Sequence, residues 1–428
     1  MEDVSIMEKF YVYKDSGVKW LGNIPQHWEV RKIKYVFTER SQKGFPKEPI
    51  LCSTQKYGVI PQHMYENRVV VVNKGLEGLK LVRKGDFVIS LRSFQGGIEY
   101  AYYQGIISAA YTILNLNDNC YSNYIKYLMK SFDFIQLLQT CVTGIREGQN
   151  INYTLLRKSS LPLPPLAEQR AIVSYLDGKV GQIDTYVAKQ TQQIELLKEL
   201  KQAVIANAVT KGIDNKAKLK QTGISWIGHV PQHWERCRCK DVLTEIKLLV
   251  GNGEYALLSL TTNGVIVRDL SEGKGKFPKD FNTYKVVKPN DLVFCLFDVD
   301  ETPRTVGLVH NHGMLTGAYN VFETKNVDTS FLYHYFIALD NRKALKPLYK
   351  GLRKVIPLPA FMSMPLYIPP LSEQRAIVSY IEAKTASINK LIDAYEQQVE
   401  RVKEYKQRLI SDAVTGKMNV TDEHTQTN

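Results

Sequence analysis

The amino-acid sequence predicts an α+β protein in which two related globular regions alternate with two long helices. The first observation is a repeat, because GVKWLGNIPQHWE at residues 17–29 returns as GISWIGHVPQHWE at 223–235, 206 residues later. The second is that PPLAEQRAIVSYLD at 164–177 returns as PPLSEQRAIVSYIE at 369–382, 205 residues later. This period is far longer than the roughly 20 to 50 residues of stacked-repeat proteins, so each copy is expected to be a domain with its own core.

The globular regions, residues 11–163 and 223–368, are each expected to mix strands and helices. In the first region, Phe87–Leu91 is a short apolar run with β-branched and aromatic residues, which is typical of a strand. A helix is predicted between Tyr121 and Leu138, because apolar residues recur there at helical spacing. Its apolar face would consist of Ile125, Leu128, Met129, Phe132 and Ile135.

A long helix is predicted after each globular region, at residues 164–211 and 369–416, each starting at a Pro-Pro pair. Apolar residues recur in both at alternating intervals of four and three, which is the pattern of a coiled-coil seam. The seam consists of Leu176, Val180, Ile183, Val187, Ile194, Leu197 and Val204 in the first helix and Ile381, Ile388, Ile392, Tyr395, Val399, Val402 and Leu409 in the second.

Each seam needs a partner, since a helix of roughly 40 residues is about 60 Å long and exceeds what one small domain covers. The other copy supplies that partner. We therefore expect an antiparallel coiled coil and an internal pseudo-two-fold, and the alternative is that each helix packs on its own globular region. Residues 212–222 are polar and basic and are expected to be a linker, whereas the tail at 417–428 is expected to be loosely ordered.

Composition is that of an ordinary globular protein, with 44% hydrophobic and 23% charged residues in 428. No stretch approaches about 18 consecutive apolar residues and MEDVSIMEKF lacks a basic segment followed by an apolar one, so we expect a cytoplasmic protein without a membrane partner. The cysteines show no disulfide-framework spacing and are expected to be free thiols. A net charge of +13 favours a polyanionic partner such as nucleic acid.

The tryptophans stand at equivalent places in the two copies. Trp20 and Trp28 lie in the first repeated segment, and Trp226 and Trp234 in the second. Bulky rings at fixed positions are interpreted as packing anchors, with stacking on a nucleic-acid base as the alternative.

Patterns of nucleotide-dependent and methyl-transfer enzymes are missing from the sequence. The glycines at 251–255 and 273–277 lack the rest of a phosphate-loop pattern. The Pro-Pro pairs stand at helix starts and not in the base-binding turn of an adenine methyltransferase. Glu245 and Lys247 have a spacing found in nucleases, but an upstream Asp partner is not evident, so chance explains them better.

A zinc site is the sharpest metal candidate, at His229, His233, Cys237 and Cys239. The repeat speaks against it, because the first copy has Asn23, His27, Arg31 and Ile33 at these positions and retains one ligand type of the four. We expect neither a metal site nor catalytic residues in this chain.

The two kinds of repeated segment, W-[LI]-G-x-[IV]-P-x-H-W and P-P-L-[AS]-E-Q-R-A-I-V, together resemble the specificity subunits of type I restriction-modification systems. The resemblance runs from about residue 11 to residue 418. It implies two target-recognition domains alternating with two conserved helices that pair as an antiparallel coiled coil. It also implies a non-catalytic DNA reader, in which each domain reads one half of a bipartite target and the coiled coil fixes the gap.

The resemblance further implies the partners. These would be double-stranded DNA, two methylation subunits docked on the long helices, and motor-nuclease restriction subunits. S-adenosylmethionine, ATP and Mg would be bound by those partners, with no cofactor in this chain.

Residues that read DNA are expected in the loops between the repeated segments, where the copies diverge. Arg reads guanine and Asn or Gln reads adenine through paired hydrogen bonds, and Gly lets a loop approach the backbone. The candidates are Lys56, Arg92, Gln95, Arg146 and Gln149 in the first region and Asn263, Arg268, Arg304, Arg353 and Lys354 in the second. Arg146 and Arg353 are the best of these, because both copies keep an Arg two residues after a Gly.

Two other functions stay open at this point. The chain could be a stand-alone DNA-binding regulator with the same duplicated architecture, in which case it would occupy a promoter without an enzyme partner. It could also be an enzyme, in which case the isolated chain would transfer methyl groups or cleave DNA.

Overall fold

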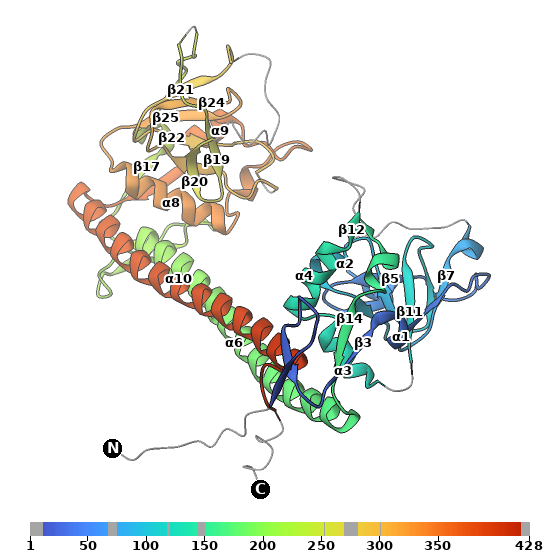
Figure 1. The fold of residues 1–428 in the computed structure, drawn as a ribbon. Coiled ribbons are helices and arrows are strands. Elements are labelled where there is room, and N and C mark those ends of the chain that lie inside the picture. Colours follow the sequence, from blue (N-terminus) through green and yellow to red (C-terminus); the bar gives the residue numbers. More distant parts are fainter. Residues whose placement is uncertain are drawn as a thin grey trace, which may run out of the picture. The chain divides into compact units, whose positions relative to one another are not determined.

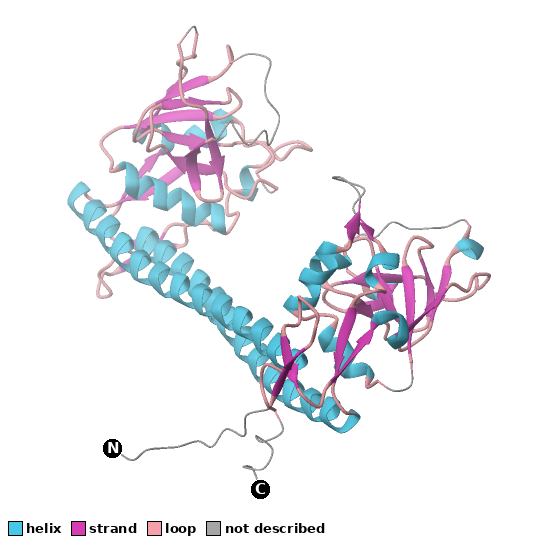
Figure 2. Ribbon diagram, in the orientation of Figure 1, coloured by secondary structure: helices cyan, strands magenta, loops and turns pink. Residues whose placement is uncertain are grey.

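The computed structural model describes residues 12–66, 75–117, 120–143, 150–251, 253–268, 281–299 and 301–420. The chain forms two compact units (Figure 1). Unit 1 comprises Met1–Gln190 and Gln397–Asn428, and unit 2 comprises Thr191–Glu396. Both units mix helices and strands (Figure 2).

Unit 1 is built on a four-stranded antiparallel sheet with the order β4-β11-β8-β9. Its strands are β4 (Phe37–Arg40), β11 (Thr112–Leu116), β8 (Phe87–Ile89) and β9 (Glu99–Tyr100). Two-stranded pairs surround it: β1 (Tyr13–Asp15) with β2 (Asn23–Pro25), β3 (Glu29–Lys32) with β14 (Ser160–Leu163), β5 (Leu51–Thr54) with β6 (Gly58–Pro61), β7 (Lys80–Val82) with β10 (Gly105–Ile107), and β12 (Val142–Thr143) with β13 (Asn150–Ile151). The short helices are α1 (Ile33–Val36), α2 (Ser93–Gly96), α3 (Ser122–Leu128), α4 (Phe132–Thr140) and α5 (Tyr153–Leu156), with single turns at Gln62–Met64 and Leu76–Gly78.

Unit 2 repeats this plan. Its four-stranded sheet has the equivalent order β18-β25-β22-β23, from β18 (Leu243–Ile246), β25 (Asn320–Thr324), β22 (Leu292–Phe294) and β23 (Val306–Leu308). The pairs are β15 (Leu219–Gln221) with β16 (His229–Pro231), β17 (Glu235–Arg238) with β26 (Pro365–Ile368), β19 (Leu258–Thr261) with β20 (Gly264–Val267), and β21 (Lys285–Val287) with β24 (Gly313–Leu315). The short helices are α7 (Cys239–Val242), α8 (Thr329–Asn341) and α9 (Leu358–Ser363), with one turn at Lys346–Leu348. The duplicated sequence therefore encodes a duplicated fold.

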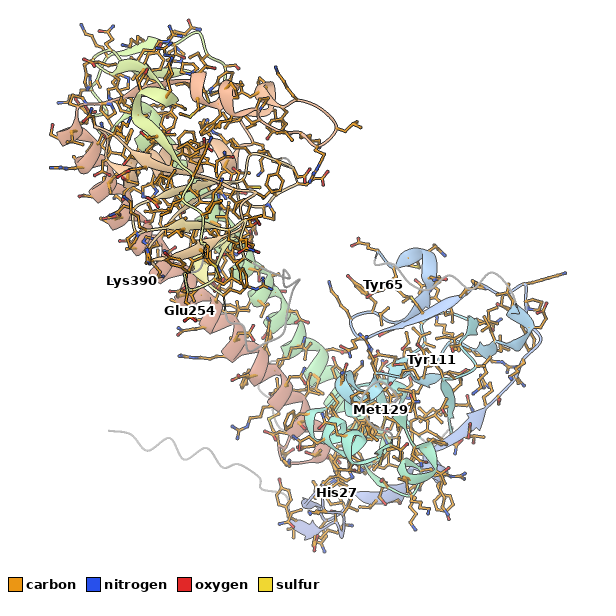
Figure 3. The ribbon with its side chains drawn as sticks, turned by 90° about the horizontal axis from the view of Figure 1, so that it is seen from above. His27, Tyr65, Tyr111, Met129, Glu254 and Lys390 are labelled. Carbon is orange, nitrogen blue, oxygen red and sulfur yellow. The ribbon has the colours of Figure 1, made fainter. Side chains whose placement is uncertain are left out.

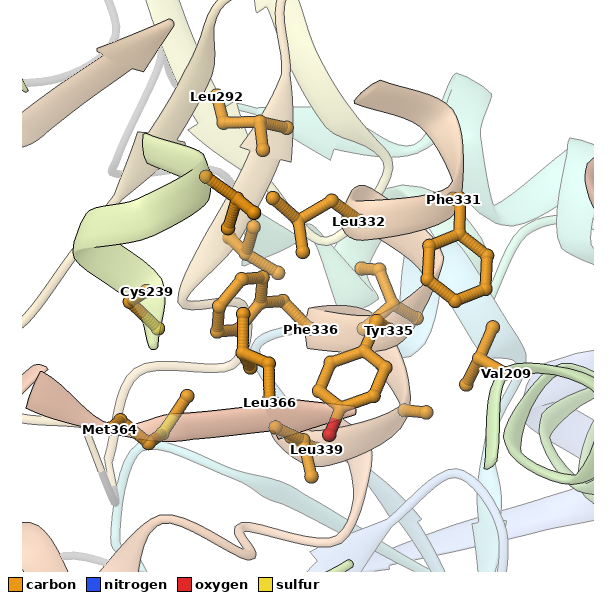
Figure 4. Packing of buried hydrophobic residues seen from close by; sticks show 14 of the residues in the cluster. Val209, Cys239, Leu292, Phe331, Leu332, Tyr335, Phe336, Leu339, Met364 and Leu366 are labelled. Carbon is orange, nitrogen blue, oxygen red and sulfur yellow. The ribbon is translucent and has the colours of Figure 1, made fainter. Parts of the chain in front are cut away.

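The core of each unit joins the sheet to both long helices, α6 (Leu166–Lys211) and α10 (Leu371–Thr415). In unit 2, Phe331, Tyr335 and Phe336 of α8 pack with Leu292 of β22, and Val209 of α6 lies beside them (Figure 4). Ile377, Val378 and Ile381 of α10 complete this cluster. In unit 1 the equivalent cluster contains Ile172, Val173 and Leu176 of α6 together with Leu409, Ile410, Ala413 and Val414 of α10.

The long helices pair in antiparallel fashion, because the start of one meets the end of the other in each unit. In unit 1, Lys406 Nζ lies 2.6 Å from Asp184 Oδ1. In unit 2, Lys201 Nζ donates to Asn389 Oδ1 over 2.9 Å. Each predicted seam residue is buried or half-buried. The predicted pairing of the two helices is confirmed, and the alternative that each packs only on its own globular region does not hold.

The helix predicted between Tyr121 and Leu138 is interrupted, and its apolar face was partly wrong. The chain turns between α3 and α4, where the backbone N–H of Ile98 donates to the carbonyl of Met129 over 3.3 Å. After the turn, Phe134, Leu137 and Leu138 are buried, whereas Phe132 is exposed.

The segment expected to be a linker and the one expected to be a loosely ordered tail both contain residues that take part in the fold. The linker at 212–222 contains β15, which pairs with β16. The tail packs on unit 1 as far as Val420, which is buried in its core, and 421–428 lie outside the described residues. Among the helices that the structure describes, none combines the length and apolarity that crossing a membrane requires.

Candidate nucleic-acid interface

The two repeated segments meet in each unit and form what we call the motif clasp, made of His27, Trp28 and Glu168 in unit 1. The indole Nε1 of Trp28 donates to Glu168 Oε1 over 3.0 Å, and His27 Nε2 lies 2.7 Å from Glu168 Oε2. His27 is labelled in Figure 3. The Glu168 side chain is only 9% exposed, so the carboxylate is held between the two rings.

Unit 2 has the same clasp with closely similar distances. Trp234 Nε1 donates to Glu373 Oε1 over 3.1 Å, and His233 Nε2 lies 2.7 Å from Glu373 Oε2. The interpretation of Trp28 and Trp234 as packing anchors agrees with their burial. The clasp ties each globular region to the start of the long helix that follows it.

A glutamine next to each clasp carboxylate adds a second attachment. Gln169 Nε2 donates to the carbonyl of Pro164, and its Oε1 accepts from the backbone N–H of Tyr121, both over 2.8 Å. Gln374 bonds in the same way to Pro369, over 2.8 Å, and to the N–H of Asp328, over 2.7 Å. Sequence reasoning missed these roles, although the identity of Glu and Gln in both copies was the signal. Since the repeated residues are used for scaffolding, residues that discriminate between DNA sequences are to be sought in the loops that differ.

In unit 2 the structure brings two of the predicted reading segments together, the loop after β22 and the turn at 350–355. Arg353 Nη2 lies 3.0 Å from Asp298 Oδ2, and its guanidinium lies over the ring of Phe297 at 5.9 Å. The backbone N–H of Asp298 donates to the carbonyl of Arg353 over 3.0 Å. The Arg353 side chain nevertheless remains 73% exposed, so its guanidinium is positioned and accessible.

The turn at 350–355 is closed by two backbone hydrogen bonds between Lys350 and Val355, of 2.8 and 3.0 Å. Gly351 and Lys354 both have left-handed backbone angles, with φ of 69° and 45°. Lys354 is half-buried, whereas Leu352, at the tip between them, is fully exposed.

Arg304 has a different environment from Arg353. Its Nη1 donates to Asn341 Oδ1 over 2.8 Å and lies 3.3 Å from Asp340 Oδ2, and its side chain is 20% exposed. Asp340 also accepts from the N–H of Thr305 over 2.9 Å. These contacts fix the loop between β22 and β23 on α8, so most of the Arg304 side chain is not accessible to a ligand.

In unit 1 an ion pair also holds the equivalent segment, between β8 and β9, but the acidic and the basic residue have exchanged places. Here the acid, Glu99, is on the strand, and the base, Lys130, follows the helix α3, with the two side chains in an ion pair. Lys130 Nζ also donates to the carbonyl of Gly96 over 2.8 Å. The Glu99 side chain is 3% exposed, and this burial raises its pKa to about 7 although Lys130 acts in the opposite direction. The candidates Arg92 and Gln95, in and before α2 on this loop, are both exposed.

Lys56 lies in an aromatic surface that sequence reasoning did not foresee. Its Nζ is 4.8 Å from the ring centre of Tyr57, at the turn between β5 and β6. A cavity of about 650 Å³ is lined there by Lys56, Tyr57, Ile60, Met64, Tyr65, Glu66, Tyr102 and Tyr103. Tyr65 is labelled in Figure 3. Exposed aromatic rings next to lysines suit the stacking of bases beside a phosphate backbone.

The remaining candidates are distributed as follows. Asn263 is exposed at the turn between β19 and β20, which is equivalent to the turn that carries Lys56 in unit 1. Arg268 directly follows β20 and is half-buried. Arg146 and Gln149 lie outside the described residues, between the strands of the hairpin β12-β13.

The proposed zinc ligands do not form a site. In the part of the chain that the structure describes, no group of three or more His, Cys, Asp or Glu side chains is arranged to hold a metal ion. Burial and the nearby charges of Asp241 and Glu235 raise the pKa of Cys237 to about 11, which disfavours the thiolate that zinc requires.

Comparison with known proteins gives consistent matches along the chain. A family model described as the type I restriction modification DNA specificity domain matches residues 25–196 and 305–401. The type I restriction enzyme MjaVIII specificity subunit of Methanocaldococcus jannaschii is 24% identical over 443 residues, covering 95% of this chain and 97% of the relative. The EcoKI specificity subunit of Escherichia coli K12 is 24% identical over 323 residues, covering 70% of this chain and 66% of the relative.

One solved structure supports the fold. It comes from work on complex assembly and conformational transition of the type I R-M system, and it matches with a TM-score of 0.65 at 15% identity. The match covers 92% of this chain and 99% of that chain. At this identity the likeness concerns the fold alone.

Proposed function

The chain belongs to the type I restriction-modification DNA specificity domain family, and from this premise we propose that each of its two units reads one half of a bipartite DNA target. The observation that carries the proposal is the contrast within the duplication. The motif clasps and sheet orders are the same in both units, whereas the loops that Lys56, Arg92, Arg353 and Asn263 occupy differ in sequence and contacts. Two DNA-reading units that share one fold but differ in their loops suit a DNA target whose two halves differ in sequence.

Charge supports DNA as the ligand of these loops. The chain carries 56 Lys and Arg against 43 Asp and Glu. In unit 2, Arg342 to Lys354 contain six basic residues, and no acid occurs between Asp340 and Glu373. Neutralising phosphates with clustered bases releases counterions and supplies most of the affinity for a duplex. The exposed guanidinium of Arg353 in this segment supports its proposed role in reading a base edge.

We further propose that two methylation subunits dock on the long helices, one on each unit. On these helices, the exposed residues that are identical in both copies form two groups. The first is Leu166, Arg170 and Ser174, equivalent to Leu371, Arg375 and Ser379, and the second is Gln192, Gln193, Glu195, Lys198, Glu199 and Gln202, equivalent to Gln397, Gln398, Glu400, Lys403, Glu404 and Gln407. Unit 1 carries the first group from α6 and the second from α10, and unit 2 carries the reverse. Exposed side chains that the fold does not require are free to diverge, so their identity supports a partner that binds twice.

A cavity in unit 1 supports this surface. It has a volume of about 510 Å³ and is lined by Lys403, Glu404, Gln407 and Arg408 of α10 together with Phe132 and Asp133 of α4 and other residues near the end of α10. Phe132 is the residue that was expected in the core and is instead exposed. An exposed aromatic ring beside repeated polar residues is typical of the anchor of a protein interface.

The chemistry would then belong to the partners. S-adenosylmethionine would be bound by the methylation subunits, and ATP with Mg by motor-nuclease restriction subunits. This chain would contribute the choice of DNA sequence and, through α6 and α10, the gap between the half-sites.

Co-purification and methylation mapping test this proposal. The chain is expressed with the methylation protein of its host, and the molecular mass of the purified complex is measured. N6-methyladenine is then mapped in cells with and without the chain. We expect two methylation subunits per chain and a methylated bipartite motif that disappears without it. Occupied DNA sites without any retained methylation subunit would instead support the stand-alone regulator.

The docking surface has a matched control on the same helix. Lys403→Glu is expected to remove the methylation subunit from unit 1 only, so that one subunit per chain is left, and adding Lys198→Glu removes both. Lys189→Glu is the control, because Lys189 is also exposed on α6 but has Ala394 as its equivalent in the second copy. An equal effect of all three substitutions would contradict the assignment of the surface.

A further inference from the structure

The turn at 350–355 presents an apolar side chain where polar ones are the rule. Leu352 is fully exposed, and among the leucines of unit 2 that the structure describes the next most exposed is Leu248, at 59%. A leucine at the tip of this turn contributes no hydrophobic stabilisation to the fold, because its side chain is as exposed to water in the folded chain as in the unfolded one. A ligand that covered it would therefore gain the burial of the whole side chain.

The turn holds this leucine in a fixed place. Two backbone hydrogen bonds close it between Lys350 and Val355, and a third joins the N–H of Lys354 to the carbonyl of Gly351 over 3.1 Å. Arg353 anchors it to Asp298 in the neighbouring reading loop. Because both flanks are tied down, Leu352 would lose little conformational freedom on binding.

Backbone strain gathers around the same turn. Asp298, Lys343 and Lys354 all have left-handed φ angles, of 47°, 45° and 45°, which cost free energy in residues other than glycine. Lys343 Nζ donates to the carbonyl of Thr302 over 2.8 Å, so it too supports the loop between β22 and β23. Strained residues of this kind concentrate where a site must be held in shape.

The chemistry around Leu352 identifies the ligand as DNA and not protein. Lys350 and Arg353 are exposed on either side of it, and the segment from Arg342 to Lys354 is basic throughout. A bare apolar tip between cations matches a duplex, which has phosphates outside and apolar base surfaces within its grooves. Side chains such as leucine contact these surfaces in two ways, at the methyl group of thymine or between bases at an opened step.

We propose that Leu352 is a specificity-determining residue that packs on an apolar base surface in the half-site read by unit 2. The proposal rests on the proposed function, since it assumes that unit 2 reads DNA. The first copy has Gly144-Ile145-Arg146 where the second has Gly351-Leu352-Arg353, so an apolar residue stands in the same place in its sequence. Those first-copy residues lie outside the described part of the chain.

The test uses the complete complex with its methylation subunits and measures the dissociation constant by fluorescence anisotropy. The probes are a duplex selected by the wild-type complex from a randomised library and the same duplex with the unit 2 half-site scrambled. Leu352→Ala is expected to reduce the preference for the selected duplex about tenfold, which is about 1.4 kcal/mol, and to leave discrimination at the other half-site unchanged. Leu352→Met should keep most of the preference, because it retains an apolar tip.

Leu248→Ala is the matched control, since Leu248 is also an exposed leucine of unit 2 but lies outside the turn. It should bind both duplexes as the wild type does. Equal preference in Leu352→Ala and wild type would overturn the proposal, and so would loss of the methylation subunit from Leu352→Ala, which would make this tip a protein contact. If the wild-type complex prefers no duplex at all, the proposed function itself fails.

Two further arms separate the sources of the apolar surface. Replacing single thymines of the half-site by uracil removes only the methyl group, so a thymine contact would weaken binding by the wild type but not by Leu352→Ala. An opened step would instead raise the fluorescence of 2-aminopurine placed beside it, with the wild type only. If the wild type shows neither the loss of binding with uracil nor the rise in 2-aminopurine fluorescence, the proposal is overturned.

Discussion

At the scale of single residues, the clasp carboxylates explain why the sequence repeats itself where it does. Glu168 accepts from Trp28 and contacts His27, and Glu373 does the same for Trp234 and His233. The carboxylate accepts from a buried indole N–H that would otherwise be desolvated without a partner, and it also contacts a histidine ring that is about half exposed. The repeated motifs therefore attach each globular region to the long helix that follows it.

Glu168→Ala should destabilise unit 1 by about 2 to 3 kcal/mol, because the buried indole N–H of Trp28 is left without an acceptor. Urea unfolding followed by tryptophan fluorescence measures this change. Glu29→Ala is the control, since Glu29 is an exposed glutamate of unit 1 that pairs with the nearby Arg31. A loss equal to that of the control would show that the clasp does not stabilise the unit.

Glu99 predicts a pH dependence of stability in unit 1. Its folded-state pKa is raised to about 7 from 4.5, so between these values the folded chain binds more protons than the unfolded one. The contribution of Glu99 is complete below pH 4.5 and is lost as the pH rises through about 7. Burial dominates the shift, and Lys130 offsets part of it.

Glu99→Gln should therefore flatten this dependence. We expect the difference in unfolding free energy between about pH 5 and about pH 8 to shrink by on the order of 2 to 3 kcal/mol relative to wild type. Urea titrations at the two pH values give that difference. An unchanged dependence would mean that Glu99 ionises normally in the folded protein.

At the scale of elements, periodicity predicted the long helices well because their seam is a local pattern. Positions such as Ile194 and Ile392 recur at coiled-coil intervals whatever the rest of the chain does, and both are buried. The segment at 121–138 was predicted less well. At its break, Met129 and Lys130 contact Ile98 and Glu99, which lie just before and at the start of β9, far away in the sequence. A tertiary contact of this kind leaves no periodic trace in the sequence.

The candidate DNA-reading residues also divide into those that a sequence pattern indicates and those whose surroundings depend on tertiary contacts. Arg353 was singled out because both copies keep an Arg after a Gly, and its guanidinium is exposed. Arg304 was chosen by residue type alone, and its contact with Asp340 could not be foreseen because nothing local links them. Leu352 was passed over, since an apolar residue in a variable loop is not distinguished by composition.

The paired helices make a prediction about the gap between half-sites. Inserting one heptad into both α6 and α10, after Gln190 and Glu396, lengthens each helix by about 10 Å. This corresponds to about three base pairs at 3.4 Å per step. Methylation mapping should show a longer preferred gap with unchanged half-sites, whereas an unchanged gap would contradict the ruler. The same insertion in α6 alone should disturb the seam and reduce binding to any target.

At the scale of the whole molecule, the two globular regions share the same motif clasp and differ in their loops. We therefore expect the regions to be interchangeable. Both regions attach through the same His, Trp, Glu and Gln contacts. A chain carrying residues 17–163 again in place of 223–368 should therefore assemble and methylate a target whose two halves have the same sequence. Mapping of methyladenine in cells with this chain checks the outcome, and the natural chain is the control. A mixed or unchanged motif would show that specificity is not confined to the exchanged region.

The division of the core between chain segments has a consequence for how the protein is made. Unit 1 needs Leu409, Ile410, Ala413 and Val414, and the hydroxyl of Tyr124 donates to the carbonyl of Val414 over 2.8 Å. These residues follow Glu396, where unit 2 ends, so they are synthesised after every residue of unit 2. The first globular region to be translated is thus the last to be completed. A chain whose synthesis stops after Glu396 would contain all of unit 2 and would leave this core of unit 1 uncovered, so we expect such a product to be cleaved by proteases faster than the natural chain.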